Sequence, residues 1–318
     1  MTRLRIGTRG SALALWQSRH IAARLAVLVP DVTIELVEIV STGDRVTDLP
    51  LSHVEGTGFF TATIEQALLD RQVDVAVHSC KDLPVAPTPD LVLAAIPTRG
   101  PVEDALVARD RLTLATLPPG ARVGTCSLRR TAQVRARRPN LLCVPLRGNV
   151  PTRVARVVNG ELDAIVLARA GLERLGLADH ITEVFDTAEV LPAPAQGALA
   201  VQCHAADVHV HALLMRLDDP ETRRAVTAER HVLHVLGGGC SVPVGAQAVV
   251  HQDRITLVAA VFDVTDGRAL RAVSVGPTPE AVGDAVARSL LDLGAGAWLD
   301  AAESAAALDA SRPDGVPA

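Results

Sequence analysis

The first two-thirds of the chain alternates short apolar segments with amphipathic ones, and this alternation restricts the possible folds more than any other feature. The segments Leu4–Gly7, Thr33–Val40 and Val73–Val77 have the length and apolar character of buried strands. Ser11 is a candidate cap for a helix, and the segment around Ile64 repeats apolar residues at helical spacing. Strands that alternate with helices predict βαβ units on mainly parallel sheets.

Two Pro-rich stretches divide this pattern. Residues 97–101 end the first α/β series, and residues 191–197 end a second one. The second series has expected strands at 121–124, 141–146 and 163–167, and a further strand is expected at 198–203. We therefore expect two α/β halves joined by two hinge crossings, with a ligand cleft between them.

The pattern changes again near Pro220, where a helix leads to the glycine-rich segment 237–239. Strands at 244–251, 255–262 and 270–275 and a helix at 279–293 then predict a small α+β C-terminal domain. The expected division is 1–98 with 198–216, then 103–192, then 220–310, with a tail at 311–318. The polar loop 41–58 contains three glycines and is expected to form a lid.

Composition excludes several classes of protein. No apolar run approaches the roughly 20 residues that a membrane span needs, so no membrane partner is expected. The first residues lack a secretory signal, and the five cysteines form no CxxC pair, which favours a reducing, cytoplasmic compartment without a metal site. A net charge of −5 and an aromatic content of 2% argue against a nucleic-acid partner.

Arginine is concentrated between Arg122 and Arg174. This stretch has eleven arginines against three acidic residues, so it carries about +8 in an otherwise acidic chain. Several of these arginines follow expected strand ends, where α/β sheets present ligands. The exceptions are Arg135, Arg137 and Arg138, which fit a solvated helix face better. Because arginine binds carboxylates bidentately, the pattern predicts a site for a small polyanion.

Three further residues are candidates for chemistry. Lys81 is the single lysine, so 30 of the 31 basic residues are arginines; it is either a chance survivor or a position where a compact ammonium is needed. Asp82 follows it at the end of an expected strand and could stabilise a cation or move a proton, or simply cap a turn before Pro84. Cys240 follows three glycines and is either idle or an attachment point for a bulky group.

Taken in chain order, these segments resemble the porphobilinogen deaminase family, also called hydroxymethylbilane synthases. The resemblance covers roughly residues 4 to 245, and several motifs in order are more specific than any one of them. The matching motifs are Thr8–Ser11 with Ala14–Gln17, His78–Pro84, Gly124–Arg130, Leu146–Val150, Ala170–Gly176, Thr227–Arg230 and Gly238–Pro243.

The resemblance implies two α/β domains like those of periplasmic binding proteins and a third domain with the cofactor cysteine. It implies a dipyrromethane cofactor linked by a thioether to Cys240, and a monomeric transferase of tetrapyrrole (heme) biosynthesis. Such an enzyme deaminates four porphobilinogen molecules, joins them head to tail on this primer and releases hydroxymethylbilane by hydrolysis. Asp82 and Lys81 are the implied catalytic residues.

The resemblance also implies two sets of binding residues. Besides Cys240, the cofactor set is Lys81, Asp82, Ser11, Thr125, Ser127, Arg129, Arg130, Arg147 and Gly148. The substrate set is Arg9, Ser11, Gln17, Arg147, Arg153 and Arg174. The chain departs from the family pattern at Thr57, Glu103, Pro151, Ala195 and His204. Pro151 falls in a first helical turn, which tolerates proline.

Two other functions remain open at this stage. A solute-binding protein for a small dicarboxylate would use the same hinged cleft, but it predicts a secretion signal and gives no role to Cys240. An Arg-rich RNA-binding module predicts stacking aromatic residues, and no Phe or Trp lies between Arg122 and Arg174.

Overall fold

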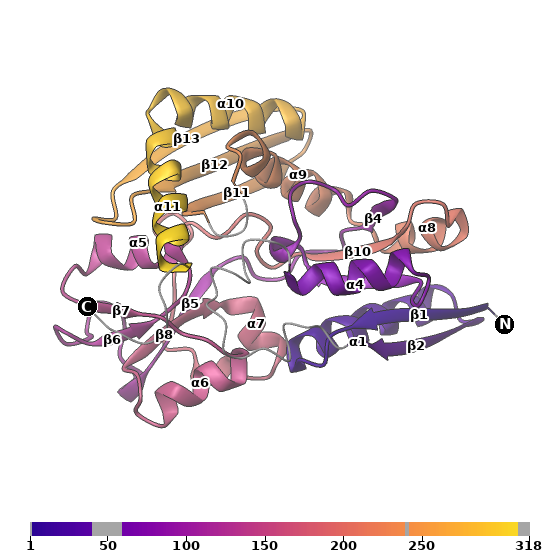
Figure 1. The fold of residues 1–318 in the computed structure, drawn as a ribbon, viewed down its shortest axis with the longest axis horizontal. Coiled ribbons are helices and arrows are strands. Elements are labelled where there is room, and N and C mark those ends of the chain that lie inside the picture. Colours follow the sequence, from indigo (N-terminus) through magenta and orange to yellow (C-terminus); the bar gives the residue numbers. More distant parts are fainter. Residues whose placement is uncertain (1, 40–58, 239–241, 311–318) are drawn as a thin grey trace.

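The computed structural model describes residues 2–39, 59–238 and 242–310, which form three β-sheets with helices packed against them (Figure 1). Two sheets have five strands each and are mixed, and the third has three antiparallel strands. The expected fold, with two α/β halves and a smaller α+β part, is confirmed. The expected lid at 41–58 lies outside the described residues.

The first sheet has the strand order β2-β1-β3-β10-β4. Its strands are β1 (Thr2–Thr8), β2 (Val32–Glu38), β3 (Val75–Ser79), β4 (Leu91–Ala95) and β10 (Leu199–His204). Helices α1 (Ala12–Leu28), α4 (Phe59–Leu69) and α8 (Val208–Leu214) pack against it, and a 3₁₀ turn, η5 (Met215–Leu217), follows α8. Ser11 caps α1 as expected, because its Oγ accepts a hydrogen bond from the N–H of Ala14.

The second sheet has the order β7-β6-β8-β5-β9. Its strands are β5 (Asp104–Ala108), β6 (Arg122–Gly124), β7 (Leu142–Val144), β8 (Ala164–Ala168) and β9 (Glu183–Val184). Its helices are α5 (Leu128–Arg137), α6 (Val150–Val158) and α7 (Arg169–Arg174), with 3₁₀ turns η3 (Arg109–Arg111) and η4 (Ala178–His180). Asn149 caps α6, and Pro151 lies in its first turn, as expected.

The third sheet, β11 (Val244–His251), β12 (Arg254–Phe262) and β13 (Ala269–Gly276), packs against α9 (Pro220–Val235) and α10 (Pro279–Asp292). Its core contains Val232, Ile255, Leu257, Val286 and Leu290, each fully buried. Helix α11 (Ala295–Ala310) follows α10 and packs against α10 and β12.

The expectation of mainly parallel sheets is confirmed, because four of the five strands in each of the first two sheets run in the same direction, but each sheet also contains one reversed strand. Strand β10 runs antiparallel to both β3 and β4, and β5 runs antiparallel to both β8 and β9. In each sheet the reversed strand is the first one that the chain forms after it crosses from the other sheet, since β5 follows β4 and β10 follows β9. Strand β3 also begins two residues later than expected, because Asp74 bonds Arg5 with its side chain and backbone.

The two crossings lie side by side. The N–H of Gly100 donates to the carbonyl of Gly197 at 3.2 Å, and Arg99 Nε donates to the carbonyl of Gln196 at 2.7 Å. Gly197 has a φ of +86°, and a Cβ there would lie 2.5 Å from the carbonyl oxygen of Pro101, so this position requires glycine. The two segments therefore form one tightly packed junction between the sheets.

Glu229 of α9 fastens this junction to the third sheet. Its carboxylate is fully buried and accepts a hydrogen bond from each terminal nitrogen of Arg99, at 2.8 and 2.9 Å. It also accepts the N–H of Ala195 at 2.6 Å and the N–H of Ala248 on β11 at 2.8 Å. One side chain thus joins both crossings and β11.

Among the described residues, no helix is both long and apolar enough to cross a membrane.

Candidate active site

The Lys81–Asp82 turn is the centre of the candidate site. Strand β3 is buried almost throughout and ends at Ser79, where a short 3₁₀ turn, η2 (Cys80–Asp82), begins. Cys80 is fully buried, and its N–H donates to the carbonyl of Ala198 next to β10. Lys81 is partly buried and Asp82 is exposed. The turn therefore presents a carboxylate to solvent from a rigid, buried base.

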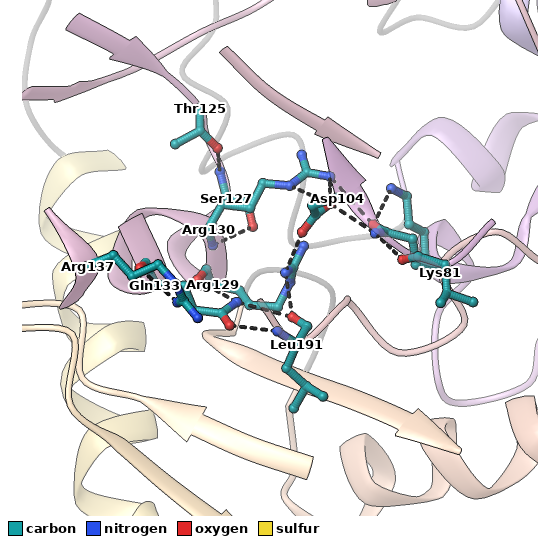
Figure 2. A network of polar contacts seen from close by, with 11 residues as sticks. Lys81, Asp104, Thr125, Ser127, Arg129, Arg130, Gln133, Arg137 and Leu191 are labelled. Carbon is teal, nitrogen blue, oxygen red and sulfur yellow. Dashed lines mark hydrogen bonds and ion pairs between the residues drawn. The ribbon is translucent and has the colours of Figure 1, made fainter. Parts of the chain in front are cut away.

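Lys81 is linked through Gln196 to the buried carboxylate of Asp104. Figure 2 shows Lys81 and Asp104 in this network. Lys81 Nζ donates to Gln196 Oε1 at 3.3 Å, and Gln196 Nε2 donates to Asp104 Oδ1 at 2.9 Å. Gln196 Nε2 also donates to the carbonyl of Val102 at 2.8 Å. The amide of Gln196, in the second crossing, therefore connects the first sheet to the first strand of the second sheet.

Asp104 binds both arginines that follow β6. Arg130 donates to its Oδ1 through Nε and a terminal nitrogen, at 3.1 and 2.7 Å, and Arg129 donates to its Oδ2 at 2.8 Å. All three side chains are nearly or fully inaccessible to solvent. Burial alone would raise the pKa of Asp104, but the two guanidinium groups hold it far below its ordinary value. The carboxylate is therefore ionised and neutralises part of the cationic cluster.

The same cluster changes the acidity of the lysine. Burial and the positive charge of Arg130 lower the pKa of the Lys81 amine to about 8, although Asp82 and Asp104 act in the opposite direction. Near neutral pH, a group with this pKa can both hold and release a proton.

Because Lys81 carries the only ε-amine of the chain, its pKa can be tested directly. At pH 8 about half of this amine should be neutral, whereas an ordinary lysine would be less than about 1% neutral. The rate of labelling by an amine-reactive reagent, followed at Lys81 by peptide mapping of the Cys240→Ser protein, should therefore rise with pH to a midpoint near 8. Nα-acetyl-lysine amide is the control, and a midpoint near 10 for the protein would contradict the shift.

The strand-to-helix junctions of the second sheet gather the other expected residues. Ser127 Oγ accepts the N–H of Arg130 at 3.4 Å and so caps α5, and Thr125 Oγ1 accepts the N–H of Ser127 at 3.2 Å. Before α6, Arg147 is exposed and Gly148 has a φ of +104°. Arg153 Nε donates to the carbonyl of Gly148 at 2.6 Å.

The remaining expected residues lie along α1 and at its junction with α7. Gln17 is buried, and its Nε2 donates to Ser79 Oγ at 2.8 Å, directly before the Lys81–Asp82 turn. Arg174 donates to the carbonyl of Gly197 at 2.6 Å, and its guanidinium lies 5.4 Å from the ring centre of Trp16. Burial lowers the pKa of His78 to about 4, and the charge of Arg9 adds to this shift. Arg9 itself directly follows β1, which ends at Thr8.

Sequence reasoning missed Asp104, Gln196, Arg99 and Glu229. One signal was available, because Asp104 begins an otherwise apolar run, and a carboxylate in a buried strand needs a cationic partner. The structure joins Lys81, Arg129 and Arg130 in one network and places Gln17 beside the same turn. Arg147 lies in the exposed loop before α6. Cys240 lies outside the described residues.

The chemistry of this donor set fits a group with several carboxylates. An amine, guanidinium groups, hydroxyls and the capped N-termini of α5 and α6 supply hydrogen-bond donors and positive charge. Among the described residues, no group of three or more His, Cys, Asp and Glu side chains could hold a metal ion.

Comparison with known proteins identifies related chains. Residues 4–212 match the family described as "Porphobilinogen deaminase, dipyromethane cofactor binding domain", and residues 223–292 match "Porphobilinogen deaminase, C-terminal domain". A porphobilinogen deaminase of Stenotrophomonas maltophilia (strain K279a) is 48% identical over 302 residues, which cover 94% of this chain and all of that protein. A porphobilinogen deaminase of Thermobifida fusca (strain YX) is 50% identical over 291 residues, covering 90% of each chain.

Solved structures with a similar arrangement include the methionine-binding protein MetQ. It is 12% identical, with a TM-score of 0.42 over 68% of this chain and 89% of MetQ. A sulfonate-binding protein, SsuA from Methylobacillus flagellatus, is 13% identical, with a TM-score of 0.40 over 74% of this chain and 69% of that one.

Proposed function

The chain belongs to the porphobilinogen deaminase family, and from this premise we propose how its own residues carry the reaction. The enzyme is a hydroxymethylbilane synthase, a transferase of tetrapyrrole biosynthesis that works with a dipyrromethane cofactor. It joins four porphobilinogen molecules with loss of ammonia from each. The observation that carries the assignment of roles is the exposed Asp82 beside Lys81, on a turn fixed against a buried cationic network.

Cys240 is the proposed attachment point of the cofactor, through a thioether. Bound dipyrromethane supplies the pyrrole carbon to which substrate units are added. The residues proposed to hold its carboxylates and pyrrole nitrogens are Ser11, Lys81, Asp82, Thr125, Ser127, Arg129, Arg130, Arg147 and Gly148. The donor chemistry of the two capped helix ends and of Lys81 supports this proposal.

Asp82 is proposed to act on the reacting atoms. Its carboxylate stabilises positive charge as ammonia leaves the aminomethyl group of the substrate, and it accepts hydrogen bonds from pyrrole N–H groups. Lys81 lies next to it, and its pKa of about 8 allows its amine to carry a proton at neutral pH. Both roles suit a turn whose base is buried and rigid. A charged group that is already held in place stabilises the charge developing on the substrate without a structural rearrangement during the reaction.

The substrate carboxylates are proposed to bind a second set of polar residues, which shares two members with the cofactor set. It consists of Arg9, Ser11, Gln17, Arg147, Arg153 and Arg174. Arg147 is exposed, so an anion in solvent can approach its side chain. Arg129, a member of the cofactor set, is almost fully buried and bonds Asp104 and the carbonyl of Leu191, so it also holds the buried network in place.

We propose three domains, with residues 1–98 and 198–216 in the first, 103–192 in the second and 220–310 in the third, followed by a tail at 311–318. The separation of the strands into three sheets supports this division. The enzyme is further proposed to work in the cytoplasm as a monomer on porphobilinogen, without a nucleic-acid partner.

Intact mass tests the attachment. The purified protein should exceed the mass of its polypeptide by two linked pyrroles, and Cys240→Ser should have the bare mass. Cys203→Ser is the matched control, because Cys203 is a buried thiol on β10 and should leave the excess in place. A bare mass for the unaltered protein, unchanged after incubation with porphobilinogen, would instead favour a binding protein without chemistry.

A further inference from the structure

Arg230 reaches from the third sheet's helix α9 to the Lys81–Asp82 turn. Its guanidinium donates three hydrogen bonds to backbone carbonyls, one terminal nitrogen binding Cys80 and Leu83 at 3.1 Å each and the other binding Pro84 at 2.6 Å. These acceptors flank Lys81 and Asp82 on both sides.

The contact fixes the shape of the turn. The Cys80 carbonyl also accepts the N–H of Leu83, the bond that closes the 3₁₀ turn, so the guanidinium binds the turn at its closing point. A guanidinium has several donors in one rigid plane, whereas an ammonium acts as a point charge on a flexible stem. Arg230 can therefore hold three carbonyls in one relative orientation.

The helix that carries Arg230 is itself anchored to the first sheet and to the crossings. Arg223 of α9 donates to the carbonyls of Leu93 and Ala94 on β4, and Glu229 binds Arg99 and Ala195. The guanidinium therefore acts from a rigid support. A displacement of α9 would be transmitted to the turn through these three bonds.

We propose that Arg230 is a positioning residue for the reaction: by clamping the carbonyls of residues 80, 83 and 84 from α9, it sets the direction of the Asp82 carboxylate and the Lys81 amine. This inference rests on the proposed role of Asp82. Arg230 acts through the turn and contacts neither substrate nor cofactor in this scheme.

The first test compares Arg230→Gln with Arg224→Gln in the holoenzyme. Arg224 is a matched control, because it lies on the same helix and also donates to three carbonyls, those of Gln252, Asp253 and Pro277, within the third sheet's unit. Arg230→Gln should lower kcat about 10- to 100-fold, with KM changed less than about threefold and the cofactor mass retained, because a catalytic group misplaced by about 1 Å can cost about 100-fold in rate. Arg230→Lys should recover part of the loss, and Arg224→Gln should keep near-normal kcat.

A second readout does not depend on activity. Cys80 is fully buried, and burial raises the pKa of its thiol, so alkylation at this residue is slow in the intact turn. Arg230→Gln should accelerate alkylation of Cys80, measured by peptide mapping, while Arg224→Gln leaves it unchanged. If both variants alkylate alike and retain kcat alike, Arg230 does not position the turn.

The Asp82→Asn background separates this proposal from the one on which it rests. If Arg230 acts through Asp82, Arg230→Gln should lower turnover by less than about threefold in that background. A full 10- to 100-fold additional loss would assign Arg230 a role independent of Asp82 and overturn the inference. Normal turnover of Asp82→Asn alone would instead overturn the proposed role of Asp82.

Discussion

Asp82→Asn should leave the protein folded and loaded with cofactor while turnover falls by about 10²- to 10⁴-fold, the range that a positioned acid or base contributes. The side chain is exposed at the end of a short turn, so its replacement by an amide of the same shape should cost little stability. The amide lacks the negative charge that would stabilise a cation on the substrate. Product formation from porphobilinogen, with intact mass and melting temperature measured on the same sample, checks the result.

Asp90→Asn is the control for this experiment. Asp90 is an exposed aspartate eight residues further on, and its φ of +62° suits asparagine as well as aspartate. It should retain normal turnover. Asp82→Asn with more than about a tenth of the normal turnover would remove Asp82 from the reaction and leave Lys81 as the reactive group of the turn.

Glu229→Gln should give the largest loss of stability, about 3–5 kcal/mol, or a fall in melting temperature on the order of 10 °C. The buried carboxylate accepts four hydrogen bonds, two from Arg99 and two from the backbone N–H groups of Ala195 and Ala248. The NH₂ group of glutamine would have to face at least one of these donors. The Arg99 guanidinium, itself largely buried, would lose its counter-charge.

Glu173→Gln is the matched control, because the Arg169–Glu173 pair is a partly exposed ion pair within one helical turn. Such pairs contribute less than about 1 kcal/mol, so its melting temperature should fall by no more than about 4 °C. Both melting temperatures are measured by thermal unfolding in the same buffer. Equal shifts would show that the buried contacts of Glu229 contribute no more to stability than the partly exposed Arg169–Glu173 pair.

The sequence was sufficient to predict features that local chemistry decides. Ser11 caps its helix as its position before an apolar, helix-forming run indicates, and the three strands of the C-terminal sheet follow their alternating pattern closely. The family motifs also identified the segment 78–84, on which the candidate site is centred. These features depend on neighbours within a few residues, which a single sequence contains.

Features decided by distant segments could not be predicted. The direction of β10 depends on the path of the chain through the second sheet, and the pairing of Asp104 with Arg129 and Arg130 joins residues about 25 positions apart. Ala195 is fully buried and has a φ of +62°, a backbone conformation that explains why the family commonly has glycine at this position. No local sequence pattern predicts this conformation.

The strand order of the first sheet has a consequence for the ribosome-bound chain. Strand β10 lies between β3 and β4, yet it is synthesised more than 100 residues after them. Until residues 199–204 leave the ribosome, β3 has an unpaired inner edge and β4 has no strand to pair with in this sheet, and such edges invite non-native pairing. The N-terminal unit therefore cannot complete its folding before the unit encoded after it has been made, so the chain departs from the usual order in which domains fold one after another during synthesis.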